Sequence, residues 1–318
     1  MMPEISVVIS AHNPHPDRFG RALQGLLRQT LLPRRWELVL VDNASWPPID
    51  FAALAHRFEN IVPIREERLG LAFGRLAGIQ RSRAGILVFI DDDNVVGPDY
   101  LQNSLAIFHR HPGLGLGGGK SLPEWESGDP EAWVRESYGN LALRDLGDHE
   151  LLASLSTPRV YPACAPIGAG MIARRGAIQG WVSRCAGDAV LTGRRGSELA
   201  SGEDCDIVLS ALQDGWSVGY FPELSLIHLI ASARVTREYL SHLNYGIAKS
   251  WIQVLARHGI YPWPPAAPWS VPFRKARAYF RCRVWDGPAE YVRWKGACGQ
   301  FDGRAEIPTS EGHPGRAY

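Results

Sequence analysis

Short apolar runs and stretches of helical periodicity alternate along roughly the first 90 residues of the chain. The apolar runs predict strands at residues 5–10, 36–41, 61–64 and 86–90. Apolar residues at helical spacing predict one helix around residues 19–27 and another over 71–81. Strands that alternate with helices are typical of βαβ units, so we predict an α/β fold with a mostly parallel central sheet flanked by helices.

A polar segment follows the end of three of these predicted strands. The segments are residues 10–13, 42–45 and 91–94. The carboxyl ends of parallel strands meet at one edge of an open sheet, where such folds bind their ligands. We therefore expect the three segments to converge on one crevice that suits a nucleotide.

The most informative polar segment is the acidic triplet Asp91-Asp92-Asp93, directly after the apolar run 86–90. Neighbouring carboxylates repel each other unless a cation joins them, and Asp oxygens suit Mg²⁺ or Mn²⁺. On an extended backbone Asp91 and Asp93 point the same way and would face one ion or ligand, while Asp92 points to the opposite side. The alternative is a solvated acidic turn ahead of a helix that starts at Pro98.

Several motifs occur in the order and spacing of one known family. They are Ser10-Ala11-His12-Asn13, Val41-Asp42-Asn43-Ala44-Ser45, the Gly/Ala/Arg segment 69–79, Asp91-Asp92-Asp93, Gly168-Ala169-Gly170-Met171, Ser201-Gly202-Glu203-Asp204-Cys205-Asp206, Gly215-Trp216, Tyr220-Phe221-Pro222-Glu223-Leu224 and Leu226-Ile227-His228. Over about residues 4–240 the chain resembles family 2 glycosyltransferases, in particular bacterial cell-envelope and exopolysaccharide members. The resemblance implies a GT-A (Rossmann-like) fold, a nucleoside-diphosphate sugar donor, a divalent metal and inversion at the anomeric carbon. Leu76 and His12 stand where the family often has Asn and Tyr, and both departures bear on donor fit.

The resemblance places the nucleotide donor against the ends of the first strands. The residues that it implies are Ser10, Ala11, Asn13, Asp42, Arg75, Asp91 and Asp92. The Asp42 carboxylate would accept hydrogen bonds from the nucleoside base, and Asp91 would reach the ribose. The alternatives are a turn-forming Asp42, a surface Arg75 on a helix and a structural Asp92.

The resemblance also implies metal ligation by Asp93 and Asp91, with His228 as a third ligand or a contact to the diphosphate. Asp93 is the expected direct ligand, and Asp91 can bind through water. Mg²⁺ or Mn²⁺ would offset the charge that builds on the β-phosphate as the glycosidic bond breaks. Because His228 follows the apolar pair Leu226-Ile227, a buried and hydrogen-bonded core histidine is the alternative.

A second acidic cluster, Glu203-Asp204, supplies the candidate catalytic base. An inverting transfer needs a group that takes the proton of the acceptor hydroxyl as it attacks. Asp204 matches the family's base position, Glu203 would orient Asp204 or the acceptor, and Asp206 would brace the helix start. Ser201 ahead of these carboxylates is also typical of a helix N-terminus, which lowers carboxylate pKa values and keeps the base ionised. If the cluster is only a helix cap, the chain has no obvious base.

The segment 115–160 is expected to shape the acceptor side. It places Trp125 and Tyr138 among Gly, Pro and acidic residues, and aromatic faces can stack on sugar rings. The alternative is that these aromatics anchor a long loop. By the resemblance, Gly170 and Met171 lie at the acceptor site, where a small residue lets the backbone approach a ligand closely.

Composition narrows the class of protein. The 318 residues, 45% of them hydrophobic, suffice for one large core plus an appendage, and a net charge of +1 argues against general nucleic-acid binding. The five cysteines are odd in number and lack C-x-x-C spacing, which fits a reducing cytosol without disulfides or a zinc site. Pro3 and Glu4 lead directly into the first strand, so no signal peptide is expected, and no apolar run is long enough to predict a spanning helix.

We expect a transferase domain over residues 1–235 and a helical, Pro-, Trp- and Arg-rich extension over 236–318. Residues 240–255 carry apolar side chains at helical spacing and predict an amphipathic helix that packs on the core. A proline-rich connector and a basic helix with aromatic residues follow, and residues 274–295 can contact an anionic membrane. The alternative is an ordinary helix with a solvated face. The end of the chain, from residue 307, is expected to fray.

We therefore predict a metal-dependent inverting glycosyltransferase that moves a sugar, with a UDP-sugar as the expected donor, to a saccharide or lipid-linked saccharide. We expect it in the cytoplasm, peripheral to the inner face of the plasma membrane, in polysaccharide synthesis for the cell envelope. Two other classes stay open: a sugar nucleotidyltransferase, and a catalytically inactive GT-A-like protein that binds carbohydrate or membrane. A nucleotidyltransferase usually carries a Gly-rich, basic loop after its first strand, and residues 11–17 have neither feature. A phosphatase of the haloacid dehalogenase type would carry its D-x-D pair on the first strand, not on a later one.

Overall fold

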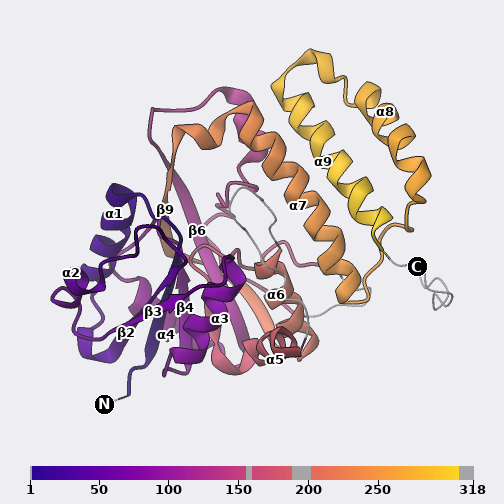
Figure 1. Cartoon of the computed structure of the whole chain (residues 1–318). Coiled ribbons are helices and arrows are strands. Elements are labelled where there is room, and N and C mark those ends of the chain that lie inside the picture. The colour runs from indigo at the N-terminus through magenta and orange to yellow at the C-terminus, as the bar shows by residue number, and fades with distance from the viewer. Residues whose placement is uncertain (1, 155–159, 188–201, 308–318) are drawn as a thin grey trace.

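The structure is a computed structural model and describes residues 2–154, 160–187 and 202–307. The described residues form one nine-stranded sheet with helices on both faces. Three further helices of the C-terminal part lie together beside the sheet (Figure 1).

The first half of the sheet is parallel, as predicted. Its strands are β1 (Ile5–Ala11), β2 (Trp36–Asn43), β3 (Ile61–Glu66) and β4 (Ile86–Ile90). Strand β1 pairs with β2 on one side and β4 on the other, and β3 pairs with the outer edge of β2, all in parallel. The helices of this half are α1 (Pro16–Leu27), α2 (Phe51–Ala55) and α3 (Leu71–Arg81). The four predicted strands and both predicted helices are confirmed.

The second half of the sheet is mixed in direction. Its strands are β5 (Asn94–Val96), β6 (Leu114–Trp125), β7 (Leu151–Ala153), β8 (Ile172–Arg174) and β9 (Ser217–Ile230). The order across the sheet is β3-β2-β1-β4-β8-β6-β9-β5, and β7 also pairs with β9. Strand β8 is antiparallel to β4 and β6, and β5 and β7 are antiparallel to β9, whereas β6 and β9 are parallel. The parallel arrangement predicted for the sheet therefore describes its first half.

Two buried clusters cover the two faces of the sheet. The helices α4 (Tyr100–Arg110), α5 (Gln179–Gly187) and α6 (Glu203–Gln213) complete the layers. Val7 and Ile9 of β1 belong to the cluster that includes α1 and α4, and Val8 belongs to the cluster that includes α3, α5 and α6. Successive strand residues point to opposite faces, so a strand that is buried on both faces reads as a continuous apolar run. Short 3₁₀ helices lie at Pro33–Arg35, Ala132–Ser137, Arg175–Ile178, Ser232–Val235, Pro268–Ser270 and Val284–Asp286.

The C-terminal part consists of α7 (Arg237–Arg257), α8 (Val271–Arg281) and α9 (Pro288–Ala305), with α8 outermost (Figure 1). Helix α7 confirms the predicted amphipathic helix. Its Leu240 and Leu243 share a buried cluster with Ile230 of β9 and Val292 of α9. Helix α7 thus contacts residues on both sides of the predicted domain boundary at 235/236. That boundary stays a prediction.

The basic segment 274–295, expected as one helix, is divided between α8 and α9. Arg283 adopts a left-handed backbone conformation (φ 54°) between these helices and ends the first of them. Within the described residues, no helix combines the length and the apolar character that crossing a membrane requires.

Candidate active site

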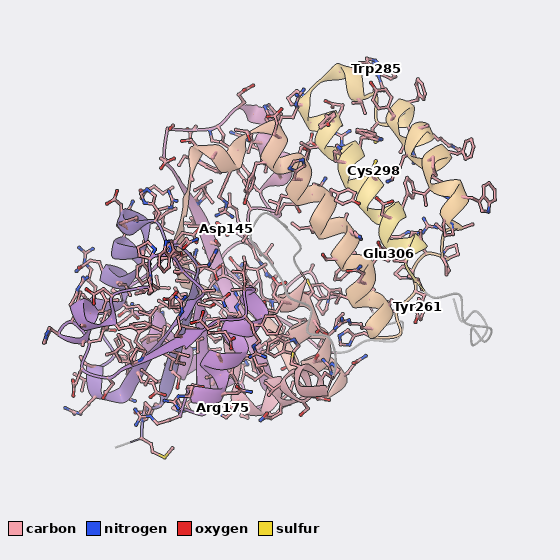
Figure 2. The ribbon with its side chains drawn as sticks, viewed as in Figure 1. Asp145, Arg175, Tyr261, Trp285, Cys298 and Glu306 are labelled. Carbon is pink, nitrogen blue, oxygen red and sulfur yellow. The ribbon has the colours of Figure 1, made fainter. Side chains whose placement is uncertain are left out.

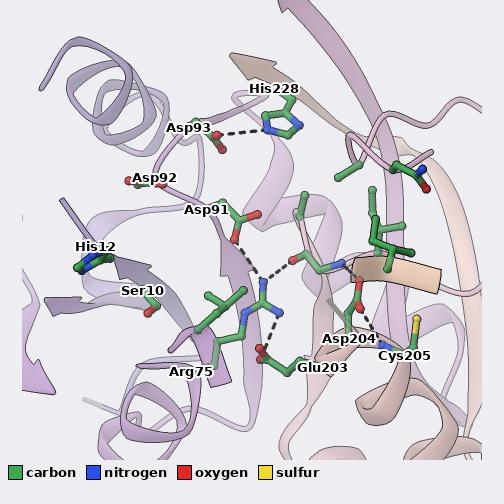
Figure 3. A pocket seen from close by; sticks show the side chains of 18 of the residues that line it. Ser10, His12, Arg75, Asp91, Asp92, Asp93, Glu203, Asp204, Cys205 and His228 are labelled. Atoms are coloured by element: carbon green, nitrogen blue, oxygen red, sulfur yellow. Dashed lines mark hydrogen bonds and ion pairs between the residues drawn. The ribbon is translucent and has the colours of Figure 1, made fainter. Parts of the chain in front are cut away.

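A cleft of about 390 Å³ opens at the edge of the sheet where the predicted polar segments lie. The candidate residues on its wall are Ser10, Arg75, Asp91, Asp92, Asp93, Glu203, Asp204 and His228. Figure 3 shows the acidic triplet and His228 on one side of the cleft, Glu203 and Asp204 on another, and Arg75 between them. Asn43 at the end of β2 also lines the cleft, so the predicted convergence of three strand ends is confirmed.

The acidic triplet forms a turn between β4 and β5, not an extended run. Asn94, which is fully buried, holds this turn: its Oδ1 accepts a hydrogen bond from the Asp91 backbone N–H at 3.3 Å, and its Nδ2 donates to Asp93 Oδ1 at 3.1 Å. The extended backbone from which the common direction of Asp91 and Asp93 was predicted is therefore wrong, and whether both serve one ion stays a prediction. The two carboxylates contact different cationic side chains.

Asp91 contacts Arg75, which lies at the floor of the cleft and is buried. The Arg75 guanidinium donates through Nη2 to Asp91 Oδ1 at 3.2 Å and to the Gly168 carbonyl at 3.3 Å, and through Nη1 to Glu203 Oε1 at 3.4 Å. The alternative of a surface arginine is therefore wrong. Arg75 joins the acidic turn to the Glu203 side of the cleft.

Close packing of α3 on the sheet puts Arg75 in this position. A Cβ at Gly74 would lie 1.9 Å from Ser10 Oγ, and a Cβ at Gly78 would lie 2.4 Å from Val8 Cγ1. Only residues without a side chain allow the helix to approach the strands so closely. The Gly/Ala pattern of the segment 69–79 therefore has a packing cause.

Asp93 contacts His228 and Arg234. The antiparallel pairing of β5 with β9 sets Asn94 opposite His228, and His228 Nε2 lies 3.3 Å from Asp93 Oδ2. Arg234 Nη1 lies 3.0 Å from the same Asp93 oxygen and 3.2 Å from His228 Nε2. Sequence reasoning missed Arg234, because a single arginine six positions after His228 has no distinguishing pattern.

The Asp93–His228 pair fits a divalent cation in its chemistry. Carboxylate and imidazole ligands suit Mn²⁺, and Mg²⁺ commonly takes one or two carboxylates with phosphate oxygens and water at its other positions. Within the described ranges, no group of three or more His, Cys, Asp or Glu side chains is arranged to hold a metal. Two protein ligands together with a diphosphate would complete such a site. At present one arginine nitrogen contacts both of those ligands.

Asp92 also lines the cleft. Burial, together with the charges of Asp93 and Asp91, raises the pKa of Asp92 to about 7. The triplet therefore carries fewer than three full negative charges at neutral pH.

Glu203 and Asp204 begin helix α6, as predicted, with Gly202 as the N-cap; the expected cap Ser201 lies outside the described residues. Asp204 Oδ2 accepts a hydrogen bond from the Gly168 backbone N–H at 3.1 Å, and its Oδ1 accepts one from the Cys205 N–H at 2.9 Å. These donors fix the orientation of the Asp204 carboxylate at the cleft.

Glu203 is buried beside Arg75, and its Oε2 has no hydrogen-bond partner among the described residues. Burial raises the pKa of Glu203 to about 7; the charge of Arg75 opposes this shift, and the charges of Asp204 and Asp91 add to it. Glu203 and Asp204 are therefore placed in different environments although they are adjacent in sequence.

Asp206 points away from this pair. Its Oδ1 lies 2.6 Å from Nε2 of the buried His258, the residue that caps the C-terminal end of α7. The contact ties the first turn of α6 to α7, as a bracing role for Asp206 predicts.

Three of the residues predicted to bind the nucleotide-sugar donor do not line the cleft. Ala11 is buried, and Asn13 is exposed with its Oδ1 accepting a hydrogen bond from the Trp46 N–H at 2.8 Å. The Asp42 carboxylate is fully buried and accepts hydrogen bonds from the N–H groups of Ser45 and Ile49, both at 3.0 Å.

Asp42 also pairs with Arg65 at 2.6 Å. Burial alone would raise the pKa of Asp42, but the hydrogen bonds from Ser45, Ile49 and Arg65 lower it below its ordinary value. The Asp42 carboxylate is buried and hydrogen-bonded to its own turn, as the alternative of a turn-forming Asp42 predicts. Its contact with a nucleobase stays a prediction.

The residues predicted to contact the sugar acceptor also do not line the cleft. Trp125 packs on Tyr138 with ring centroids 5.6 Å apart, within the cluster that includes Val134, as the loop-anchoring alternative predicts. Met171 is fully buried, and the Gly170 carbonyl accepts a hydrogen bond from the Tyr100 hydroxyl. Their neighbours Gly168 and Ala169 line the cleft instead.

Comparison with protein families identifies the class. Residues 6–128 match Glycosyl transferase family 2, and residues 86–240 match Glycosyl transferase family group 2. Together the two matches cover residues 6–240, which include the whole sheet except Ile5 and every candidate residue from Ser10 to Arg234. Over residues 6–240 the chain is therefore similar to family 2 glycosyltransferases.

Two similar proteins illustrate the range of the family. A glucosyl-dolichyl phosphate glucuronosyltransferase of Haloferax volcanii is 23% identical over 153 residues, which are 46% of this chain and 48% of that protein. The amylovoran biosynthesis glycosyltransferase AmsE of Erwinia amylovora is 29% identical over 120 residues, which are 36% of this chain and 43% of that protein. The chain thus matches less than half the length of these curated relatives.

Solved structures show the same fold at low sequence identity. TarS of S. aureus (residues 1–349, in complex with UDP) superposes with a TM-score of 0.52 at 14% identity, covering 95% of this chain and 90% of TarS. The mannosyltransferase PcManGT of Pyrobaculum calidifontis, in complex with GDP-Man and Mn²⁺, superposes with a TM-score of 0.55 at 16% identity, covering 94% and 74%. These likenesses confirm the predicted GT-A fold.

Proposed function

We propose that this protein is an inverting glycosyltransferase that moves a sugar from a nucleoside-diphosphate sugar to a hydroxyl group of a saccharide or lipid-linked saccharide. One observation carries the proposal: a single cleft holds the Asp91–Asp93 turn with His228 on one side and the Glu203–Asp204 helix start on another. The first group suits a diphosphate with its cation, and the second suits an attacking hydroxyl.

The donor would lie with its diphosphate near Asp93, His228 and Arg234 and its ribose near Asp91. Arg75 and Arg234 supply the positive charge that phosphate oxygens require. Two proteins with the same fold support this class of ligand, since TarS was solved with UDP and PcManGT with GDP-Man. We propose a UDP-sugar as the donor.

The proposed cofactor is Mg²⁺ or Mn²⁺, held by Asp93 and His228, with Asp91 reached through water. When bound, a divalent cation offsets the negative charge that develops on the leaving diphosphate. The Mn²⁺ in the PcManGT complex supports a divalent cation in this fold.

Asp204 is the proposed base. Its carboxylate lies at the N-terminus of α6 and lines the cleft, and the Gly168 N–H holds one of its oxygens. Asp204 would accept the proton of the acceptor hydroxyl as that oxygen attacks the anomeric carbon from the face opposite the diphosphate. Glu203, anchored by Arg75, would orient Asp204 or the acceptor.

The proposed acceptor is a saccharide or lipid-linked saccharide in the synthesis of a cell-envelope polysaccharide. The names of two relatives support this range, one a glucosyl-dolichyl phosphate glucuronosyltransferase and one an amylovoran biosynthesis glycosyltransferase. Trp125, Gly170 and Met171 would shape this side of the site from behind the wall. The proposed place of action is the inner face of the plasma membrane, and the basic, aromatic surface of α8 supports it.

A thermal-shift screen with UDP, GDP, dTDP and CDP, each with and without Mn²⁺, tests the proposal. One nucleotide should raise the unfolding midpoint, and Mn²⁺ should increase that shift, because ligands that bind the native state stabilise it by mass action. The double variant Asp91→Asn/Asp93→Asn should lose the part of this midpoint shift that depends on Mn²⁺. An exposed acidic pair outside the cleft, changed as Asp129→Asn/Glu131→Gln, serves as the matched control.

A second candidate function is a catalytically inactive binding protein with this fold. The ion pairs of Asp91 with Arg75 and of Asp93 with Arg234 favour it, because both outer carboxylates of the triplet already contact cations of the chain. Absence of any nucleotide-dependent shift in the screen would favour this candidate over the transferase.

A further inference from the structure

The outermost helix, α8, and the short 3₁₀ turns before and after it carry large aromatic side chains that face solvent. Trp269, Phe273, Phe280 and Trp285 are 75, 71, 66 and 59% exposed. Trp285 lies at the far end of the helical C-terminal part, and side chains of α8 project from its outer edge (Figure 2). Aromatic side chains of this size gain by leaving water, so a group of exposed ones marks an interaction surface.

The aromatic residues of α8 point away from the protein. Val271 and Ala278 are buried, and each stands two positions before an exposed phenylalanine, Phe273 or Phe280. Two positions correspond to a rotation of about 200° around a helix, so the phenylalanines lie nearly opposite the buried side. Lys275 lies on the inner side, where its Nζ donates to Asp302 of α9 at 2.7 Å. Helix α8 therefore has one apolar side on α9 and a second apolar side towards solvent.

The charge of this surface is mostly positive, although Arg283 pairs with Asp286 at 2.8 Å beside Trp285. Residues 259–285 contain four arginines and one lysine and no Asp or Glu, whereas the whole chain has a net charge of only +1. Arg274, Arg277 and Arg281 are exposed on α8 beside the phenylalanines. Aromatic side chains flanked by arginines are the pattern of a helix that lies in the interface of an anionic membrane.

We propose that the outer surface of α8, with Trp269 before it and Trp285 after it, docks on an anionic lipid bilayer. The aromatic rings would enter the boundary between headgroups and acyl chains, and the arginines would lie at the level of the lipid phosphates. The charge selects this occupant over a second copy of the chain, since two copies of the same basic surface repel each other. The inference does not depend on the proposed transferase activity.

Flotation of the full-length protein with vesicles tests the proposal. Vesicles of phosphatidylcholine alone are compared with vesicles that also contain phosphatidylglycerol, at low and high salt. The protein should float with the anionic vesicles, bind the neutral ones at least about tenfold more weakly, and lose affinity as salt screens the arginines.

Two double variants address the two parts of the surface. Phe273→Ser/Phe280→Ser should weaken binding to the anionic vesicles at least about tenfold, and Arg274→Glu/Arg277→Glu should weaken it similarly and remove most of the salt dependence. The matched controls change exposed residues near the end of α1, as Leu27→Ser/Leu32→Ser and Arg28→Glu/Arg34→Glu. These controls should bind like the unchanged protein.

Three results would overturn the inference: no flotation with anionic vesicles, binding that the α8 variants leave unchanged, or equal binding to neutral vesicles. Dimers in light scattering that the α8 variants abolish, without vesicle binding, would assign the surface to a second copy instead. Thermal unfolding of each variant confirms that it is folded. The cleft variant Asp91→Asn/Asp93→Asn should bind vesicles normally, which separates a failure of this inference from a failure of the proposed function.

Discussion

At the scale of single residues, two arginines offset the negative charge of the carboxylates in the cleft. Arg75 pairs with Asp91, and Arg234 contacts both Asp93 and His228. A nucleoside diphosphate offers phosphate oxygens to the same guanidinium groups. We expect the incoming diphosphate to draw Arg234 away from Asp93 and His228 and so to make this pair available to a cation.

In the absence of nucleotide, removal of the Arg234 charge should therefore strengthen the binding of a cation. We predict that Arg234→Met raises the affinity for Mn²⁺ about tenfold or more, because a positive charge now lies 3.0 Å from Asp93 and 3.2 Å from His228. Titration calorimetry, or the electron paramagnetic resonance signal of unbound Mn²⁺, measures the affinity. Arg237→Met, an exposed arginine three positions on, is the matched control. Unchanged or weaker Mn²⁺ binding in Arg234→Met would show that Arg234 does not compete with the cation.

Glu203 predicts a pH dependence of stability. Its pKa in the folded protein, about 7, lies above the ordinary value of 4.5, so folding favours the protonated form. Glu203 therefore makes its full contribution to the stability of the folded protein below about pH 4.5, and this contribution is lost as the pH rises through about 7. Glu203→Gln should remove this dependence, so that the variant gains up to about 3 kcal/mol relative to the unchanged protein between about pH 5 and about pH 8.

Urea unfolding of both proteins across this pH range measures the effect. Asp92 contributes equally to both proteins, so its titration cancels in the comparison. Parallel stability curves for the two proteins would mean that Glu203 titrates as an ordinary exposed carboxyl group.

Single residues show what the sequence reveals about the site and what it leaves hidden. The acidic side chains could be predicted, because Asp91 to Asp93 and Glu203-Asp204 stand at element ends in recognisable motifs. Their partners could not, because the contacts of Arg75 and Arg234 depend on residues that are 128 and 141 positions away in the chain. The extended triplet was predicted wrongly for a different reason: the side chain of the adjacent Asn94 is buried and sets a turn, and the local pattern did not indicate these hydrogen bonds.

At the scale of elements, the tight packing of α3 on β1 and β2 positions the floor of the cleft. Gly78 of α3 faces both Val8 and Val41, so the helix cannot move outward without carrying Arg75 away from Asp91. Continuous apolar runs made β1, β2 and β4 predictable. Strands β5, β7 and β8 are three residues long each and are defined by pairing across the sheet, which no local pattern indicates.

A side chain at Gly78 should disturb this packing. We predict that Gly78→Val lowers the free energy of unfolding by at least about 2 kcal/mol, because its Cβ would lie 2.4 Å from Val8 Cγ1 in a filled core. The same change at Gly20 of α1, where nothing lies within 4 Å of a Cβ, should alter it by less than about 1 kcal/mol. Chemical denaturation of both variants gives the comparison. Equal effects at the two positions would contradict the close approach of α3 to the sheet.

At the scale of the whole molecule, the C-terminal helices are coupled to the cleft. Helix α7 contacts α6 through the Asp206–His258 pair and through a buried cluster of Leu209, Val254 and Leu255, so it supports the helix that carries Asp204. The order of strands and helices could be predicted over the first half of the chain. The packing of α7 on the core was predicted from its apolar spacing, but its contacts with α6 could not be, because the spacing does not show which element the helix meets.

The most direct test of the proposed function is the release of nucleoside diphosphate from a panel of UDP-, GDP- and dTDP-sugars in the presence of Mn²⁺. Water takes the place of the acceptor in this assay, so no saccharide acceptor needs to be known. We predict that one donor is cleaved and that chelation of the cation abolishes the release. We also predict that Asp204→Asn lowers the rate about 100-fold or more while the affinity for the nucleotide stays unchanged. Full activity of Asp204→Asn, or no release from any donor by a protein that binds the nucleotide, would contradict the assignment.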